Sequence, residues 1–96
     1  MFIVSLTYVK PIEEIDALMS KHVAWLRVHY KSGLFVASGR KVPRAGGIIL
    51  ATSDSRERLD RALNEDPFVK AGAATLDVIE FTPSMTARGA EVLKSL

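Results

Sequence analysis

The sequence predicts an α+β fold of the ferredoxin-like type, in which an antiparallel sheet carries two helices on one of its faces. Three observations lead to this prediction. Four short runs are rich in β-branched and aromatic residues, two longer runs have the spacing of buried helices, and the runs follow the order β-α-β-β-α-β. With 96 residues, of which 48% are hydrophobic, the chain fits one domain spanning 1–96 with a small core.

The first predicted strand spans residues 2–9, where a face of apolar and aromatic side chains alternates with a face that includes two hydroxyls. Pro11 then opens a long helix, because a proline at the first helical position loses no hydrogen bond. Along this helix, apolar residues and two histidines recur every three or four positions, which indicates a buried stripe. Gly33 ends the helix. The stripe consists of Ile12, Ile15, Leu18, Met19, His22, Trp25, Leu26 and His29.

The second and third strands are predicted on either side of a loop. The second strand is LFVAS, and the third spans residues 47–53. Between them, residues 39–47 are rich in glycine and in basic side chains. After the third strand, Asp54 followed by Glu57 is typical of a helix N-cap with its capping-box partner, which predicts a second helix through about residue 64.

The last predicted strand spans residues 74–81, and Pro83 ends it. Residues 84–96 form a C-terminal appendage, for which we predict a short helix weakened by Gly89. Because both helices cover the same sheet face, the opposite face would expose isoleucine and valine side chains to water. A second copy of the chain would cover them, so we expect a symmetric homodimer and leave higher oligomers open.

The charge and the composition argue against several classes of function. Thirteen basic and eleven acidic residues give a net charge of +2 and are spread along the chain, so we expect no nucleic-acid partner. Residues 2–9 are apolar but too short to span a bilayer, so we expect no membrane partner. The absence of cysteine excludes a disulfide framework, and without a signal-peptide pattern the expected location is the cytoplasm.

Neither a metal nor a cofactor is predicted. His22 and His29 are seven residues apart on one helix, about 10.5 Å along its axis, which is too far for both to bind one ion. The phosphate-binding patterns GxGxxG and GxxxxGK do not occur in the chain. We therefore expect no metal site and no cofactor.

His22 is the first candidate for chemistry. It lies four residues after Leu18 and four before Leu26, so it points with the apolar stripe toward the sheet. A histidine in such a position is often a core residue that hydrogen bonds to the backbone. Alternatively, a carboxylate fixes its tautomer, and Asp66 after the second helix could approach the first helix in this fold. Pro67 would hold Asp66 out of the helical region, although the same proline is also explained as a simple helix stop.

The loop SGRKVPRAGG is the second candidate. Arg40, Lys41 and Arg44 could receive a carboxylate or a phosphate, because the guanidinium fork suits bidentate pairing. A solvated, mobile basic loop is the alternative explanation. Ser38 ends the second strand and could contact a ligand, but no histidine near it in the sequence marks it as a nucleophile. Ser38, Arg40 and Arg44 are therefore the predicted substrate-binding residues.

Four segments together resemble the YciI-like family of small proteins. They are SKHVAWL on the first helix, GLFVASG and PRAGGIILA around the loop, and DPFVKAG after the second helix, and the similarity spans residues 1–82. It implies a ferredoxin-like fold paired into a dimeric α/β barrel, an architecture shared with muconolactone isomerases and small monooxygenases. It also implies an active site formed by His22 and Asp66. Family members often have Gly-Pro after the second strand, where this chain has Gly39-Arg40 and a later Pro43.

Three hypotheses about function follow. The first is a small enzyme of lyase or isomerase type that acts on a small anionic organic molecule, with His22 as general acid and base and Asp66 orienting it. The second is a dimer that binds or senses a small molecule without catalysis. The third is a dimerisation domain in which the contact between His22 and Asp66 serves stability alone. The sequence does not indicate which substrate or reaction is involved.

Overall fold

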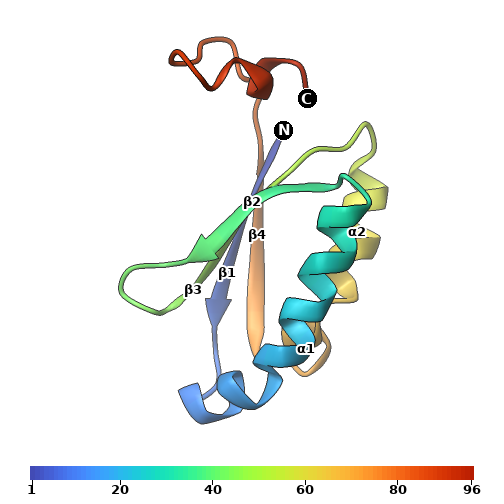
Figure 1. Cartoon of the computed structure of the whole chain (residues 1–96). Coiled ribbons are helices and arrows are strands. Elements are labelled where there is room, and N and C mark those ends of the chain that lie inside the picture. The colour runs from blue at the N-terminus through green and yellow to red at the C-terminus, as the bar shows by residue number, and fades with distance from the viewer.

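A computed structural model describes the whole chain, residues 1–96, as one sheet with its helices on one side (Figure 1). The strands follow the order β2-β3-β1-β4, and each neighbouring pair is antiparallel. This arrangement confirms the predicted ferredoxin-like α+β fold. The elements are β1 (Phe2–Tyr8), α1 (Ile12–Lys31), β2 (Phe35–Arg40), β3 (Gly46–Ala51), α2 (Arg56–Asn64), α3 (Pro67–Lys70), β4 (Ala74–Glu80) and a 3₁₀ helix, η1 (Glu91–Lys94).

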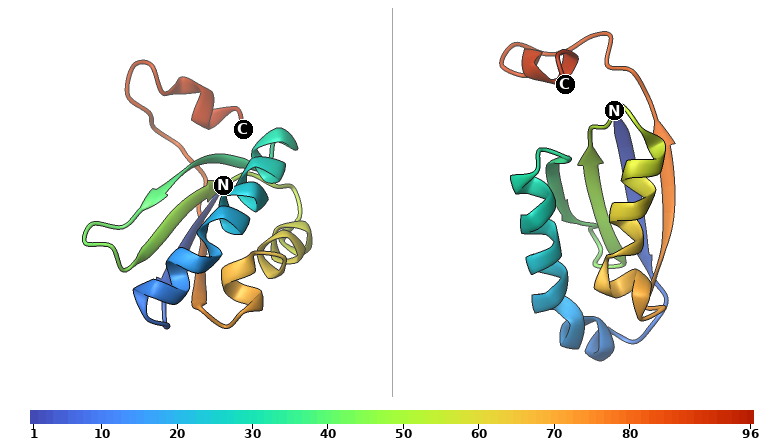
Figure 2. Two further views of the ribbon diagram at one scale, coloured as in Figure 1. Left: turned by 60° about the horizontal axis from the view of Figure 1, so that its bottom comes forward. Right: turned by 90° about the vertical axis from the view of Figure 1, so that its right-hand side faces the viewer.

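The helices cover the sheet face that the alternation in β1 predicts to be apolar. Figures 1 and 2 show α1 and α2 on the same side of the sheet. Trp25 of α1 is buried there, and its indole N–H donates to the carbonyl oxygen of Ala62 in α2 at 2.9 Å. This bond ties the two helices together while the ring fills the core. The buried side chains of β1 are Phe2, Val4 and Leu6.

The opposite face of the sheet has no helix over it. The strand register places Ile3 of β1 between Leu50 of β3 and Ile79 of β4, and Ile79 is 58% exposed. The uncovered face inferred from the sequence is therefore present, with apolar side chains from three strands on it. Neither α1 nor any other helix combines the length and the apolar character that crossing a membrane requires.

The start of α2 differs from the predicted start by one residue. Ser55 is the N-cap, with extended backbone geometry, and its hydroxyl accepts a hydrogen bond from the Arg58 amide at 3.2 Å. The predicted capping box of Asp54 and Glu57 is therefore wrong. Serine and aspartate are both good N-caps, and the backbone path out of β3 selects the second of the two adjacent candidates.

Residues 84–96 do not form the predicted terminal helix. Only Glu91–Lys94 turn into a short 3₁₀ helix, and Gly89 takes a φ of 94° just before it. The hydrogen bonds in this segment join its own residues, and the segment extends past the end of the sheet (Figure 1). A helix this short needs a surface to pack against. None supports it here, and Met85 is 89% exposed.

Gly46 is a position where the fold requires glycine. It pairs with Thr7 of β1, and a Cβ added to it would clash with the backbone carbonyl group of Leu6. We expect Gly46→Ala to lower the free energy of unfolding by about 1–3 kcal/mol, because backbone must move to admit the methyl group. Chemical denaturation measures this loss. Gly39→Ala is the matched control, since a Cβ there meets nothing within 4 Å, and an equal loss in both variants would contradict the explanation.

Candidate active site

The structure brings His22 and Asp66 together although they are 44 residues apart in the sequence. His22 Nδ1 lies 2.8 Å from Asp66 Oδ1, which is hydrogen-bonding distance. The same oxygen accepts a hydrogen bond from the Phe68 amide at 3.0 Å, so it is an acceptor and the Nδ1–H of His22 is the donor. This assignment leaves Nε2 as the imidazole nitrogen that is free to accept a proton.

The backbone around Asp66 explains how the carboxylate is held. Asp66 has a φ of −58° and a ψ of 125°, as expected for a residue before proline, and its side chain caps the short helix α3. The sequence analysis offered two explanations of Pro67, a constraint on Asp66 and a simple helix stop; the structure shows a non-helical Asp66 and a Pro67 that begins the short helix α3. Asp66 is 0% exposed, and its second oxygen has no hydrogen-bond partner. A buried carboxylate requires hydrogen-bond donors, and the Phe68 amide and His22 Nδ1 supply them here.

Aromatic side chains restrict the orientation of the His22 ring. The ring stacks on Phe68, with centroids 4.1 Å apart and planes 15° apart, and the Trp25 ring lies 5.4 Å away. The His22 side chain is only 12% exposed. Packing and the hydrogen bond to Asp66 thus hold the imidazole in one orientation, as a preorganised site requires.

A cavity of about 170 Å³ lies beside His22, between α1 and the sheet. Eight of its fourteen lining residues are hydrophobic, so it suits a ligand with an apolar body and few polar groups. The volume is below the roughly 300–1,000 Å³ of most ligand sites, which limits the ligand to a small molecule. Gly47 helps to keep this space open: it lines the cavity and pairs with Leu6 on the helix side of β3, where a Cβ would lie 3.2 Å from the Gly39 carbonyl oxygen.

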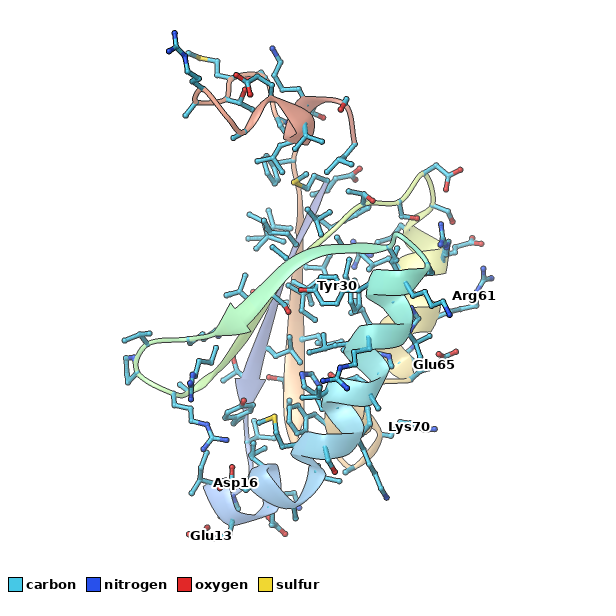
Figure 3. The ribbon with its side chains drawn as sticks, viewed as in Figure 1. Glu13, Asp16, Tyr30, Arg61, Glu65 and Lys70 are labelled. Atoms are coloured by element: carbon cyan, nitrogen blue, oxygen red, sulfur yellow. The ribbon has the colours of Figure 1, made fainter.

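Two of the three predicted substrate-binding residues lie at the cavity and the third does not. Ser38 and Arg40 line the cavity, and Arg44 does not. Arg44 donates from Nη2 to Asp16 Oδ1 at 2.6 Å, and this hydrogen bond raises the pKa of the Arg44 guanidinium. Figure 3 shows Asp16 near the N-terminal end of α1. Arg40 takes part in none of the ion pairs of the chain, so its charge is available to a ligand.

Three residues at the site were not identified from the sequence. Tyr8 and Phe68 line the cavity, and the Tyr30 hydroxyl lies 2.6 Å from Oγ of Ser38, another lining residue. Figure 3 shows Tyr30 between α1 and the sheet. The alternation in β1 indicates the direction of Tyr8, whereas Tyr30, eight residues after His22, is turned by about 80° around α1 from His22. No sequence pattern indicates that Phe68 stacks on the imidazole.

His29, the second histidine of α1, is not part of this site. Its ring packs against Trp25 and Phe35, and its Nε2 lies 3.8 Å from a carboxylate oxygen of Glu65. No three histidine, aspartate or glutamate side chains gather in a way that could hold a metal ion.

Comparisons with known proteins agree with this architecture. The family model of the YCII-related domain matches residues 1–82. Among solved structures, the chain is similar to 5-chloro-2-hydroxyhydroquinone dehydrochlorinase (TftG) from Burkholderia phenoliruptrix AC1100 in complex with 2,5-dihydroxybenzoquinone, with a TM-score of 0.71 and 16% sequence identity. The similarity covers 85% of this chain and 94% of that chain. No curated protein sequence matches this chain.

Proposed function

Since the chain belongs to the YCII-related domain family, we propose that it is a small enzyme of lyase or isomerase type. Its substrate is a small anionic organic molecule that enters the cavity beside His22. His22 acts as the general acid and base, and Asp66 orients it and stabilises its charged form. The observation that carries this proposal is the 2.8 Å contact between the fully buried Asp66 carboxylate and Nδ1 of His22, a residue that lines the apolar cavity.

The arrangement suits the transfer of one proton. Nε2 accepts a proton from a C–H or O–H group of the substrate, and the electron pair left behind forms a new double bond. In a lyase reaction, the leaving group departs with its bonding electron pair. In an isomerisation, the imidazolium returns the proton to a different atom. The buried carboxylate of Asp66 stabilises the imidazolium between these steps, as in a hydrolase triad.

The proposed roles of the arginines follow from their positions. Arg40 stands at the cavity with no ion-pair partner and would receive the negative charge of the substrate. Arg44 was predicted to share this role, but its contact with Asp16 makes a supporting role in the loop more suitable. Tyr8 lines the cavity, and it contributes to the raised pKa of the Arg44 guanidinium less than Asp16 does.

One of the solved structures that resemble this chain supports a small-molecule enzyme. That protein is a dehydrochlorinase in complex with a single-ring compound. Removal of a proton and a chloride is a lyase-type reaction, which agrees with a proton-transfer role for His22. We extend the reaction class to this chain as a proposal and leave its leaving group open.

We further propose that the chain acts as a homodimer in the cytoplasm. The uncovered sheet face presents apolar side chains from three strands, including Ile79 at 58% exposure. A second copy packed on this face would remove them from water and give the paired barrel that the family resemblance implies. The cavity lies on the other face of the sheet, between the strands and α1, so each copy would keep its own site.

A ligand screen with product analysis tests the proposed function. We expect single-ring anionic compounds, with 2,5-dihydroxybenzoquinone as the first probe, to raise the melting temperature and at least one to be converted, as detected by NMR. A ligand at a hundred times its Kd adds about 2.7 kcal/mol to the free energy of unfolding. Binding without conversion would instead support a sensing module, and a complete lack of binding would support a purely structural domain.

A cavity-filling variant identifies where the compounds bind. Gly47→Val places a side chain on the cavity side of β3, with its Cβ 3.2 Å from the Gly39 carbonyl oxygen, and should abolish the temperature shift while the variant itself still melts cooperatively. Leu50→Val is the matched control, because Leu50 pairs with Ile3 and lies on the uncovered face of the same strand. A shift that persists in Gly47→Val would mean that the compounds bind elsewhere.

A further inference from the structure

We infer that two copies of the chain pair about a two-fold axis parallel to the strands, so that Lys41 of each copy forms an ion pair with Asp77 of the partner subunit. This inference rests on the proposed homodimer and adds to it the orientation of the two copies and the contacts that fix this orientation. It follows from the distribution of charged and apolar side chains on the uncovered sheet face.

The uncovered face has one charged side chain at each of its two edges. Asp77 of β4 pairs with Ser5 of β1, so it points with Ser5 away from the helices, and it is exposed. Lys41 directly follows β2, and its Nζ donates a hydrogen bond to Thr7 Oγ1 at 3.3 Å, which places the amine on the same face. No other strand residue that points to this face is charged.

The two charges cannot pair with each other within one copy. The sheet order β2-β3-β1-β4 separates their strands by three spacings, roughly 14 Å, which is far beyond the length of an ion pair. Neither Lys41 nor Asp77 takes part in any ion pair of the chain. A face that is removed from water must pair its charges, because an unpaired buried charge is costly. The partner copy is then the source of the opposite charge.

The uncharged residues of the face decide how the copies are oriented. Ile3 lies between Leu50 and Ile79 in one row across the sheet, whereas Thr7 lies beside Thr75 in a row near the opposite end of β1. The face therefore has an apolar end and a polar end. A two-fold axis perpendicular to the strands would stack the apolar end of one copy on the polar end of the other. An axis parallel to the strands stacks the two apolar ends on each other, which buries more apolar surface.

The same axis brings opposite charges together. Rotation about it places β2 of each copy over β4 of the partner subunit, so a positive edge meets a negative edge twice in the dimer. Lys41 lies beside the row of Thr7 and Asp77 lies in the row of Ser5, so the two are offset by about 7 Å along the strands. The long, flexible lysine side chain spans this offset. Both pairs lie at the rim of the interface, where charges select the orientation of the partners.

Two charge-reversal variants test the inference. Lys41→Glu alone and Asp77→Lys alone each give a homodimer with two like-charge contacts, whereas a mixture of the two gives a heterodimer in which both contacts are attractive. We expect each variant alone to dissociate roughly 10–100-fold more readily than the native dimer, as measured by analytical ultracentrifugation. In an equal mixture of the variants, native mass spectrometry should show a heterodimer share well above the statistical half.

Lys70→Glu is the matched control, because it makes the same change of charge on the helix side, where Figure 3 shows Lys70 pointing away from the sheet. It should change the dissociation constant by less than about twofold. Loss of the hydrogen bond between Lys41 and Thr7 would not by itself raise the heterodimer share. A statistical share would overturn the inference and leave the homodimer in place. A native chain that stays monomeric at every concentration would overturn both.

Discussion

Replacing His22 with asparagine should lower turnover by roughly 10²–10⁴-fold and leave the fold intact. The asparagine amide occupies the place of Nδ1 and can still donate to Asp66, so the buried carboxylate keeps a partner. Nothing replaces Nε2, which is the nitrogen that would take the substrate proton. Steady-state kinetics on a converted compound, together with circular dichroism and a melting curve, measures both effects.

The asparagine variant is more informative than alanine at this position. Alanine would leave the buried Asp66 carboxylate without the hydrogen-bond donor at position 22, and loss of activity could then follow from loss of structure. His29→Asn is the matched control, because His29 lies on the same helix with a ring of similar burial but does not line the cavity. Full turnover in His22→Asn would remove His22 from the mechanism.

Replacing Asp66 with alanine should lower the free energy of unfolding by about 2–4 kcal/mol, in addition to abolishing turnover. The carboxylate accepts hydrogen bonds from the Phe68 amide and from His22, so its loss removes the cap of α3 and leaves two donors without an acceptor. Denaturant titration measures the change. Glu65→Ala, at the neighbouring residue, is the control. Glu65 is 66% exposed, so its replacement should change the free energy of unfolding by less than about 0.5 kcal/mol.

Asp66→Asn separates the structural role of Asp66 from its chemical role. The amide oxygen can still accept from the Phe68 amide, so most of the cap remains. The negative charge is lost, and with it the stabilisation of a protonated His22. In a hydrolase triad, the equivalent change lowers kcat by about 10⁴-fold, and we expect a loss of similar direction here. Normal turnover together with lowered stability would mean that the contact is purely structural.

Much of the candidate site could be predicted from the sequence, because the features that indicate it are local in the chain. Pro67 constrains the residue before it, and this constraint alone predicts a fixed, non-helical Asp66. The apolar stripe of the first helix orients His22 toward the sheet. The order of the elements indicates that both helices lie on one face of the sheet, so a contact between His22 and Asp66 is expected. In the structure, His22 Nδ1 and Asp66 Oδ1 are 2.8 Å apart.

Other features were missed because they depend on a partner far away in the sequence. The sequence does not distinguish Arg44 from Arg40, because both are arginines of the same loop. Only the folded structure shows that Arg44, and not Arg40, pairs with Asp16. Similarly, the sequence gives no sign that Tyr30 contacts Ser38. The contact forms only because β2, an edge strand with an irregular register, brings Ser38 to the Tyr30 hydroxyl. The prediction of a terminal helix was wrong for the opposite reason. The local sequence pattern allowed a helix, but the folded chain offers no surface for it to pack against.

The sequence by itself determined the order of the elements, the apolar face of the sheet and the two residues of the candidate dyad. The order of the elements and the apolar face follow from hydrophobic periodicity and from glycine and proline, which act over a few neighbouring residues. The two dyad residues were also indicated by the family resemblance, which extends over most of the chain. Only the tertiary structure decided that a cavity exists beside His22 and which hydroxyls and cations reach it. The physical reason is that a cavity is the space left between packed elements, so its shape depends on all of them at once, including the absent side chain at Gly47.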